Sequence, residues 1–80
     1  MKAVNSKLKL IVAERELRDR RRLGIRTIAS ESGASVSTVQ RLINNTIKNV
    51  PLDDLGRLCG YFGVSVADIL IYEETTHKAE

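Results

Sequence analysis

Residues 36–44 include several side chains that can form hydrogen bonds, those of Ser37, Thr38, Gln40 and Arg41. At helical spacing we expect these four side chains to point outward together, away from the apolar residues between them. A guanidinium such as that of Arg41 can hold guanine O6 and N7 at once. The chemistry that this segment predicts is therefore recognition by hydrogen bonding.

The chain before this segment has the small residues that a close helix crossing requires. Ala29 and Gly33 stand four positions apart, so that a small side chain can lie at the crossing and a glycine can turn the chain. The apolar residues expected to face the core from the two helices are Ile28, Ala34, Val39 and Leu42. This pattern predicts a helix-turn-helix, whose second helix offers a polar face to the major groove of DNA.

Glycines and capping residues divide the chain into five expected helices, and we expect no strand. The first, rich in good helix formers and free of Gly and Pro, should be long and basic. We expect Gly33 to end the second helix, and Ser35 and Ser65 to cap the third and fifth. The expected helices span residues 5–22, 25–32, 36–44, 51–62 and 66–70.

Apolar residues at helical spacing indicate which face of each helix is buried. In the first helix Leu10, Ala13 and Leu17 form the expected core stripe, and Leu8, Ile11 and Val12 widen it. In the fourth helix the expected buried residues are Leu52, Leu55, Leu58, Cys59 and Phe62. In the fifth helix we expect Val66, Ile69 and Leu70 to pack against the core. We expect residues 73–80 to fray.

Length and composition predict one all-α domain over residues 1–80. The chain has 80 residues, 42% of them apolar and 29% charged, which leaves no room for a second domain. Cys59 is the only cysteine and His77, the only histidine, lies in a polar tail where we expect it to be solvent-exposed. With no catalytic pair, phosphate loop or metal-ligand set, we expect no enzyme, metal, cofactor or small-molecule ligand.

The start of the chain lacks the apolar stretch of a signal peptide, and no run approaches the ~18 apolar residues of a membrane helix. We therefore expect a cytoplasmic protein with no membrane contact. Residues 1–26 carry nine basic and three acidic side chains, a net charge of +6. Residues 51–80 carry two basic and six acidic ones, a net charge of −4, so a polyanion should approach the first half.

Residues 29–42 and 50–70, taken in this order, resemble the Cro/CI-type helix-turn-helix family of phage, plasmid and bacterial transcriptional regulators. The resemblance implies a five-helix, lambda-repressor-like domain. It also implies that Val36, Ser37 and Arg41 face bases, with Gln40 at the edge of the groove. The residues that it implies at the DNA backbone are Ser35, Thr38, Asn44, Asn45 and Lys48.

The chain departs from the family pattern at two places. Many members have a polar pair at the start of the second helix, where this chain has Gly24 and Ile25, and Arg26 is our candidate to replace that phosphate contact. The segment from Arg18 to Arg22 is also more basic than the pattern. Its arginines, Arg22 among them, are either a further backbone clamp or a solvated helix end.

These observations lead to one principal hypothesis and one alternative. The principal one is a Cro-like repressor of double-stranded DNA, a homodimer with its third helices about 34 Å apart on an inverted repeat. Its dimer contact would come from the fourth and fifth helices with Tyr72. The alternative is a protein-binding module on the same fold, such as an antitoxin, antirepressor or phage-encoded inhibitor, that docks through the acidic second half. RNA binding fits less well, because the major groove of RNA is deep and narrow.

Overall fold

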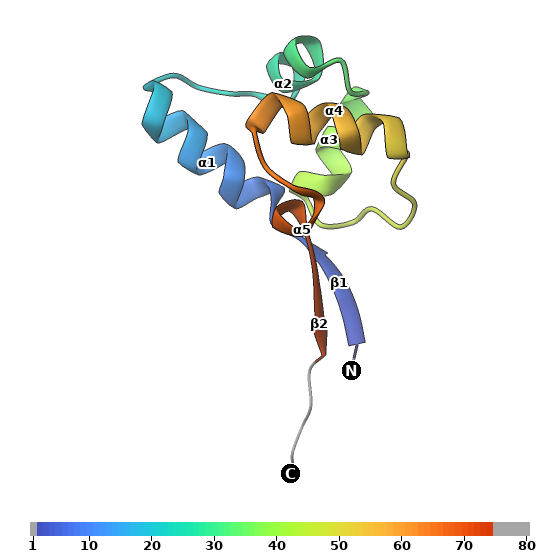
Figure 1. The fold of residues 1–80 in the computed structure, drawn as a ribbon. Helices are drawn as coiled ribbons and strands as arrows, with labels where there is room; N and C mark the ends of the chain where they lie inside the picture. The colour runs from blue at the N-terminus through green and yellow to red at the C-terminus, as the bar shows by residue number, and fades with distance from the viewer. Residues whose placement is uncertain (1, 75–80) are drawn as a thin grey trace.

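A computed structural model of the chain describes residues 2–74, and its side chains are described from residue 4 to residue 72. Five helices form one body, and a two-stranded ribbon extends from it (Figure 1). In chain order the elements are β1 (Lys2–Ser6), α1 (Leu8–Asp19), α2 (Ile25–Ser32), α3 (Val36–Ile43), α4 (Leu52–Phe62), α5 (Val66–Ile69) and β2 (Leu70–Glu74). The four expected boundaries around the helix-turn-helix agree with α2 and α3 to within one residue.

The ribbon corrects the expectation of an all-helical chain. β1 and β2 pair antiparallel, with Val4 opposite Tyr72, and the N–H of Lys7 donates to the carbonyl of Ile69 at 2.7 Å. The strands come from opposite ends of the chain but lie side by side (Figure 1). The expected fraying from residue 73 is wrong for Glu73 and Glu74, whose backbones belong to β2, whereas His77 lies outside the described residues.

The first helix is shorter than the sequence predicts. It has 12 residues and begins at Leu8, because residues 2–6 form strand β1 of the ribbon. It ends where Arg20 adopts a left-handed conformation with φ of 55°, so Arg20 and Arg22 belong to a loop and not to a basic last turn. The N–H of Leu23 donates to the carboxylate of Glu16 at 2.7 Å, which fixes this loop against the helix that it leaves.

The remaining helices end and begin where the local signals place them. Gly33 and Gly63 are left-handed, with φ of 88° and 67°, and end α2 and α4. Ser65 and Asp68 form a capping box at the start of α5. Pro51 precedes the first residue of α4, where its missing N–H costs no helical hydrogen bond.

The core lies where α1 to α5 meet, and its fully buried side chains include Leu8, Ile28, Val39, Leu42, Leu58 and Ile69. On α1 the buried side is formed by Leu8 and Val12 with half-buried Ile11. The expected stripe of Leu10, Ala13 and Leu17 is instead exposed, because α1 packs on the body through the opposite side. The expected burial of Leu52 and Val66 is also wrong: Leu52 is 80% exposed and Val66 is 49% exposed.

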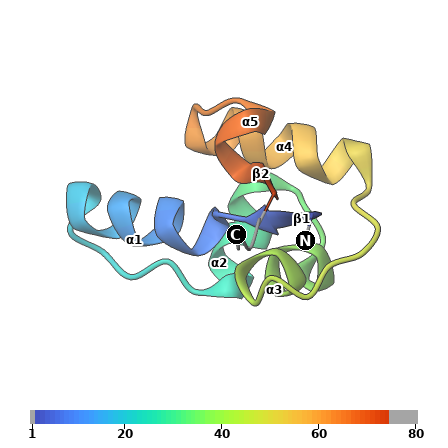
Figure 2. The ribbon, with the colours of Figure 1, turned by 90° about the horizontal axis from the view of Figure 1, so that it is seen from below.

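Arg15 ties α1 to the end of α4. Its guanidinium donates to the carbonyl of Phe62 at 3.1 Å and lies 5.4 Å from the centre of the Phe62 ring. A cation near the last carbonyls of a helix is favoured by the helix dipole. Seen from below, α1 nevertheless extends to one side of the other helices, which leaves its outer face clear (Figure 2).

Candidate nucleic-acid interface

The turn between α2 and α3 sets the direction of the candidate reading helix. Gly33 makes the turn in a conformation that L side chains rarely adopt, and Ala29 lies buried in α2 at 7% exposure. Ser35 then starts α3, because its hydroxyl oxygen accepts the N–H of Thr38 at 3.2 Å. Val39, which the sequence pattern groups with the small residues of the motif, is fully buried in α3.

α3 presents a polar face outward and an apolar face inward. Val39 and Leu42 are completely buried, while Ser37, Gln40 and Arg41 are exposed. The polar side chains thus project from a helix whose other side is fixed in the core.

The predicted outward orientation of Thr38 is wrong. Its side chain is buried, and its hydroxyl donates to Asp54 Oδ2 at 2.8 Å across the interface with α4. Thr38 follows Ser37 directly, and a rotation of about 100° per residue turns its side chain towards α4 rather than solvent. A polar side chain is tolerated there because its hydroxyl donates a hydrogen bond to Asp54.

Asp54 joins the start of α3 to α4. Its Oδ2 also lies 3.1 Å from Ser35 Oγ, and Arg57 approaches the other oxygen at 3.5 Å. The hydrogen bond from Thr38, followed by those from Ser35, lowers the pKa of the Asp54 carboxyl against the opposing effect of burial. The ionised carboxylate is therefore the favoured form and holds the first turn of α3.

The sequence alone does not identify Asp54 as part of this site. Asp53 and Asp54 both suit the start of a helix, and nothing in the spacing tells which one turns inward. In the structure Asp53 is exposed and Asp54 is buried. The one local indication is Thr38 itself, because a polar side chain at a core-facing helix position requires a buried hydrogen-bond partner.

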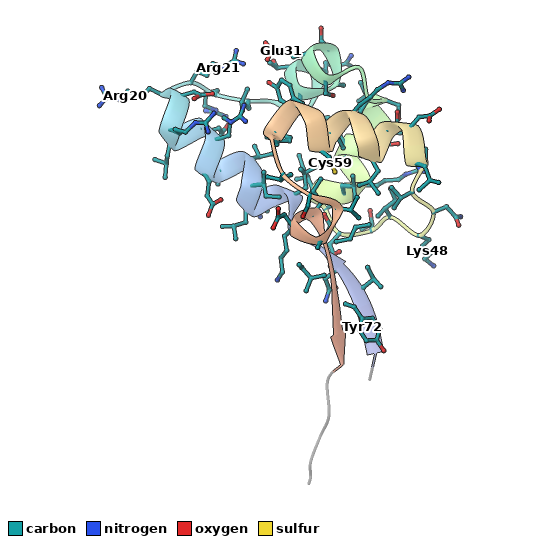
Figure 3. All side chains as sticks on the ribbon, viewed as in Figure 1. Arg20, Arg21, Glu31, Lys48, Cys59 and Tyr72 are labelled. Atoms are coloured by element: carbon teal, nitrogen blue, oxygen red, sulfur yellow. The ribbon has the colours of Figure 1, made fainter. Side chains whose placement is uncertain are left out.

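The loop after α3 carries three predicted backbone contacts, Asn44, Asn45 and Lys48, all exposed. Lys48 extends from this loop away from the helical body (Figure 3). Asn45 is left-handed, with φ of 58°, and its side chain is engaged: Oδ1 accepts the N–H of Ser6 at 2.7 Å and Nδ2 donates to Asn5 at 3.0 Å. Asn45 therefore anchors the loop to β1, a role that needs the unpredicted ribbon.

The arginines between α1 and α2 differ in their surroundings. Arg21 pairs with Glu31 at 2.6 Å (Figure 3). The phenol of Tyr61 donates to the same carboxylate. The hydrogen bond from Arg21, and then that from Tyr61, lowers the pKa of Glu31, whereas burial and the Glu31 contact raise the pKa of Tyr61. Arg22 and Arg26, the two predicted phosphate contacts, are both exposed.

Comparison with known families decides the identity of this arrangement. A family model described as the Cro/C1-type helix-turn-helix DNA-binding domain matches residues 7–75, which is most of the chain. The chain belongs to this family. No curated protein and no solved structure matches with significance.

As a Cro/C1-type domain, the chain is expected from its family to bind DNA, and the predicted resemblance is confirmed. The matched range begins at Lys7 and so includes α1 but omits β1, which ends at Ser6. Within residues 2–74, no helix is long and apolar enough to cross a membrane, and no three His, Cys, Asp or Glu side chains are close enough to bind a metal ion. Cys59 is a free, half-buried thiol.

Proposed function

We propose that this protein regulates transcription by reading a specific double-stranded DNA sequence with α3. The observation that carries the proposal is the exposed face of Ser37, Gln40 and Arg41 on a helix with a fully buried opposite face. Base recognition requires side chains that are held in place by a rigid support. The Asp54 contacts supply that support at the first turn of α3.

The proposed base readers are Val36, Ser37, Gln40 and Arg41. Arg41 would bind guanine through two parallel hydrogen bonds, and Ser37 and Gln40 can each donate or accept at a base edge. Val36 is 39% exposed and can contact a thymine methyl group.

The proposed DNA-backbone contacts are led by Arg22, Arg26 and Lys48, whose exposed cations can approach phosphates. Asn44 is exposed at the end of α3 and can donate to a phosphate through its amide. Ser35 and Asn45 stay in the proposed set, although their side chains already have partners within the chain. Thr38 is left out, because its hydroxyl is buried against Asp54.

We further propose that the protein acts as a repressor by occluding a promoter, and that it binds as a homodimer. One domain of this size reads few base pairs, and a two-fold dimer with its α3 helices about one DNA turn, roughly 34 Å, apart doubles the length that is read. The operator would then be an inverted repeat.

The test is selection of bound duplexes from a random library at near-physiological salt, followed by binding of the Arg41→Ala variant to the selected site. We expect an enriched inverted repeat and a loss of about 1–3 kcal/mol in binding, with relaxed preference at one base pair. Arg18→Ala removes the same charge from the exposed side of α1 and is the matched control. It should alter the salt dependence slightly and leave the base preference unchanged.

If no sequence is enriched, the proposal of a specific regulator fails. If Arg18→Ala relaxes the base preference as much as Arg41→Ala does, the assignment of Arg41 as a base reader fails. A stable complex with another protein, together with absent DNA selection, would favour the protein-binding alternative.

A further inference from the structure

The outer face of α1 is an apolar stripe that no other described part of the chain covers. Leu10, Ala13 and Leu17 are three and four residues apart, so they share one side of the helix. Leu10 is 58% exposed and Leu17 is 82% exposed. Because the core is served by Leu8 and Val12 on the opposite side, this second stripe is not needed to hold α1 on its own body.

We propose that this stripe binds the α1 helix of a second copy of the chain, with the two helices antiparallel. The inference rests on the proposed DNA-binding dimer and names its contact surface. It replaces the surface of α4, α5 and Tyr72 that the sequence indicated.

The shape of the stripe suits an antiparallel pair. Ala13, near its middle, is small enough to let two helices approach closely where they cross. A shallow, open hollow lies beside Leu10, next to Lys9 and Ala13, and another lies beside Leu17, next to Glu16 and Arg20. In an antiparallel pair, Leu17 of the partner subunit would lie over the first hollow and Leu10 of the partner subunit over the second.

The charges beside the stripe are compatible with this orientation. Lys9 and Glu16 are seven residues apart, which is close to two helical turns, so they lie on the same flank. An antiparallel arrangement brings Lys9 near Glu16 of the partner subunit and repeats this contact across the two-fold axis.

The rival surface has weaker features for self-association. Leu52 and Val66 are exposed at the starts of two different helices and do not form a stripe. Residues 51–80 also carry six acidic and only two basic side chains, so two copies facing each other there would repel. The α1 stripe has both signs of charge at its edge.

The expected dimer is weak. A helix of 12 residues is about 18 Å long, so a single helix pair buries less area than a standard stable interface. We therefore expect association that depends on protein concentration and that increases when two copies bind adjacent half-sites.

The test compares two leucines of nearly equal exposure by sedimentation velocity of the full chain over a range of concentrations. Leu17, 82% exposed, lies in the stripe, and Leu52, 80% exposed, lies on the rival surface. We expect Leu17→Asp to raise the dimer dissociation constant at least about tenfold, and Leu52→Asp to leave it unchanged. Circular dichroism of both variants checks that each is folded.

Loss of dimer in Leu52→Asp with retention in Leu17→Asp would overturn the proposal in favour of the rival surface. A wild-type chain that stays monomeric at every concentration and on its selected duplex would also overturn it. In both cases sequence selection by α3 can persist, so failure of this interface is distinguishable from failure of the proposed DNA reading.

Cross-linking tests the orientation directly. In a Cys59→Ser background, Leu10→Cys and Leu17→Cys are prepared separately and then mixed under mild oxidation. In an antiparallel pair, a thiol at position 10 of one chain lies opposite a thiol at position 17 of the other chain. Two thiols at the same position are roughly 10 Å apart along the helices, which is too far for a disulfide. We expect a covalent dimer mainly in the mixture. Covalent dimers that form as readily in the separate samples as in the mixture would contradict the antiparallel arrangement, as would equal cross-linking of an exposed Ala67→Cys control.

Discussion

Helices α1 and α3 each bury one face in the same core, but their outer faces have opposite chemistry. The outer face of α3 bears Ser37, Gln40 and Arg41, whereas that of α1 bears Leu10, Ala13 and Leu17. A polar outer face can form hydrogen bonds with base edges in a DNA groove. An apolar outer face is better suited to packing against another helix. The proposals above accordingly assign the two outer faces to different partners, DNA for α3 and a second copy of the chain for α1.

The two helices also differ in how they are attached. The first turn of α3 is held by the contacts among Ser35, Thr38 and Asp54, which are partly or fully buried. The loop after α1 is held by one part-buried hydrogen bond, from Leu23 to Glu16, and by exposed contacts of Arg21 with Glu31 and Tyr61. We therefore expect the position of α3 to depend on buried hydrogen bonds, and the position of the loop after α1 to depend in part on exposed charges.

The sharpest test of this comparison exchanges one leucine for alanine on each helix. Leu42→Ala removes a fully buried side chain of α3 and leaves a cavity, so the free energy of unfolding should fall by about 2–5 kcal/mol. Leu10→Ala, on the outer face of α1, should change it by less than about 0.5 kcal/mol. Urea denaturation at low protein concentration, where the chain is monomeric, measures both. A large loss for Leu10→Ala in the monomer would show that the outer stripe of α1 contributes to its own fold.

The second test removes the carboxylate that holds α3. Asp54→Ala takes away the acceptor of hydrogen bonds from Thr38 and Ser35, and bonds to a charged group contribute about 1.5–3 kcal/mol. We expect a loss of that order in the free energy of unfolding and weaker specific DNA binding. Asp53→Ala, at the exposed neighbour, is the matched control and should have little effect.

The same carboxylate predicts a dependence on pH. The pKa of Asp54 is lower in the folded chain than in the unfolded chain, chiefly because of the hydrogen bond from Thr38. Its contribution to stability is therefore present above the unfolded pKa of about 4 and is lost as the pH falls through the folded pKa. The wild type should lose more stability than Asp54→Ala between about pH 5 and about pH 2. Parallel pH profiles would contradict this assignment.

The third test acts on the turn that orients α3. Gly33→Ala forces a side chain into a backbone with φ of 88° and places its Cβ 3.3 Å from the flexible Arg57 side chain. We expect a loss of about 1–2 kcal/mol, mostly from the left-handed backbone. Gly56→Ala lies inside α4 with nothing within 4 Å of the new Cβ, so it should stabilise the chain by about 0.5–1 kcal/mol. Thermal unfolding of the pair should show shifts of opposite sign, and shifts of the same sign would contradict the role given to the Gly33 backbone.

Features set by neighbouring residues could be predicted from the sequence. The bounds of α2, the N-cap Ser35 and the stop at Gly33 follow from capping and glycine rules that act over a few residues. The polar face of α3 follows from the period of the helix. For these elements local propensity and the final packing agree.

Features set by distant partners could not be predicted. β1 has residues that also suit a helix, and it is a strand because it pairs with residues 70–74 at the other end of the chain. The choice between the two apolar stripes of α1 depends on which side meets the body, since Leu8 and Leu10 are equally apolar. Thr38 faces inward because Asp54, sixteen residues away, accepts its proton.

The smallest expected effect concerns the exposed contacts after α1. Glu31→Gln keeps the shape of the side chain but removes the charge that pairs with Arg21 at 2.6 Å. Exposed ion pairs are screened by salt, so we expect a slight loss of thermal stability at low salt that shrinks when salt is added. Tyr61→Phe, which removes only the phenol that donates to Glu31, is the neutral comparison, and its effect should vary less with salt. The comparison would fail if Glu31→Gln lost as much stability as Asp54→Ala, or if its loss did not depend on salt. The exposed ion pair after α1 would then contribute to stability in the same way as the buried hydrogen bonds of α3.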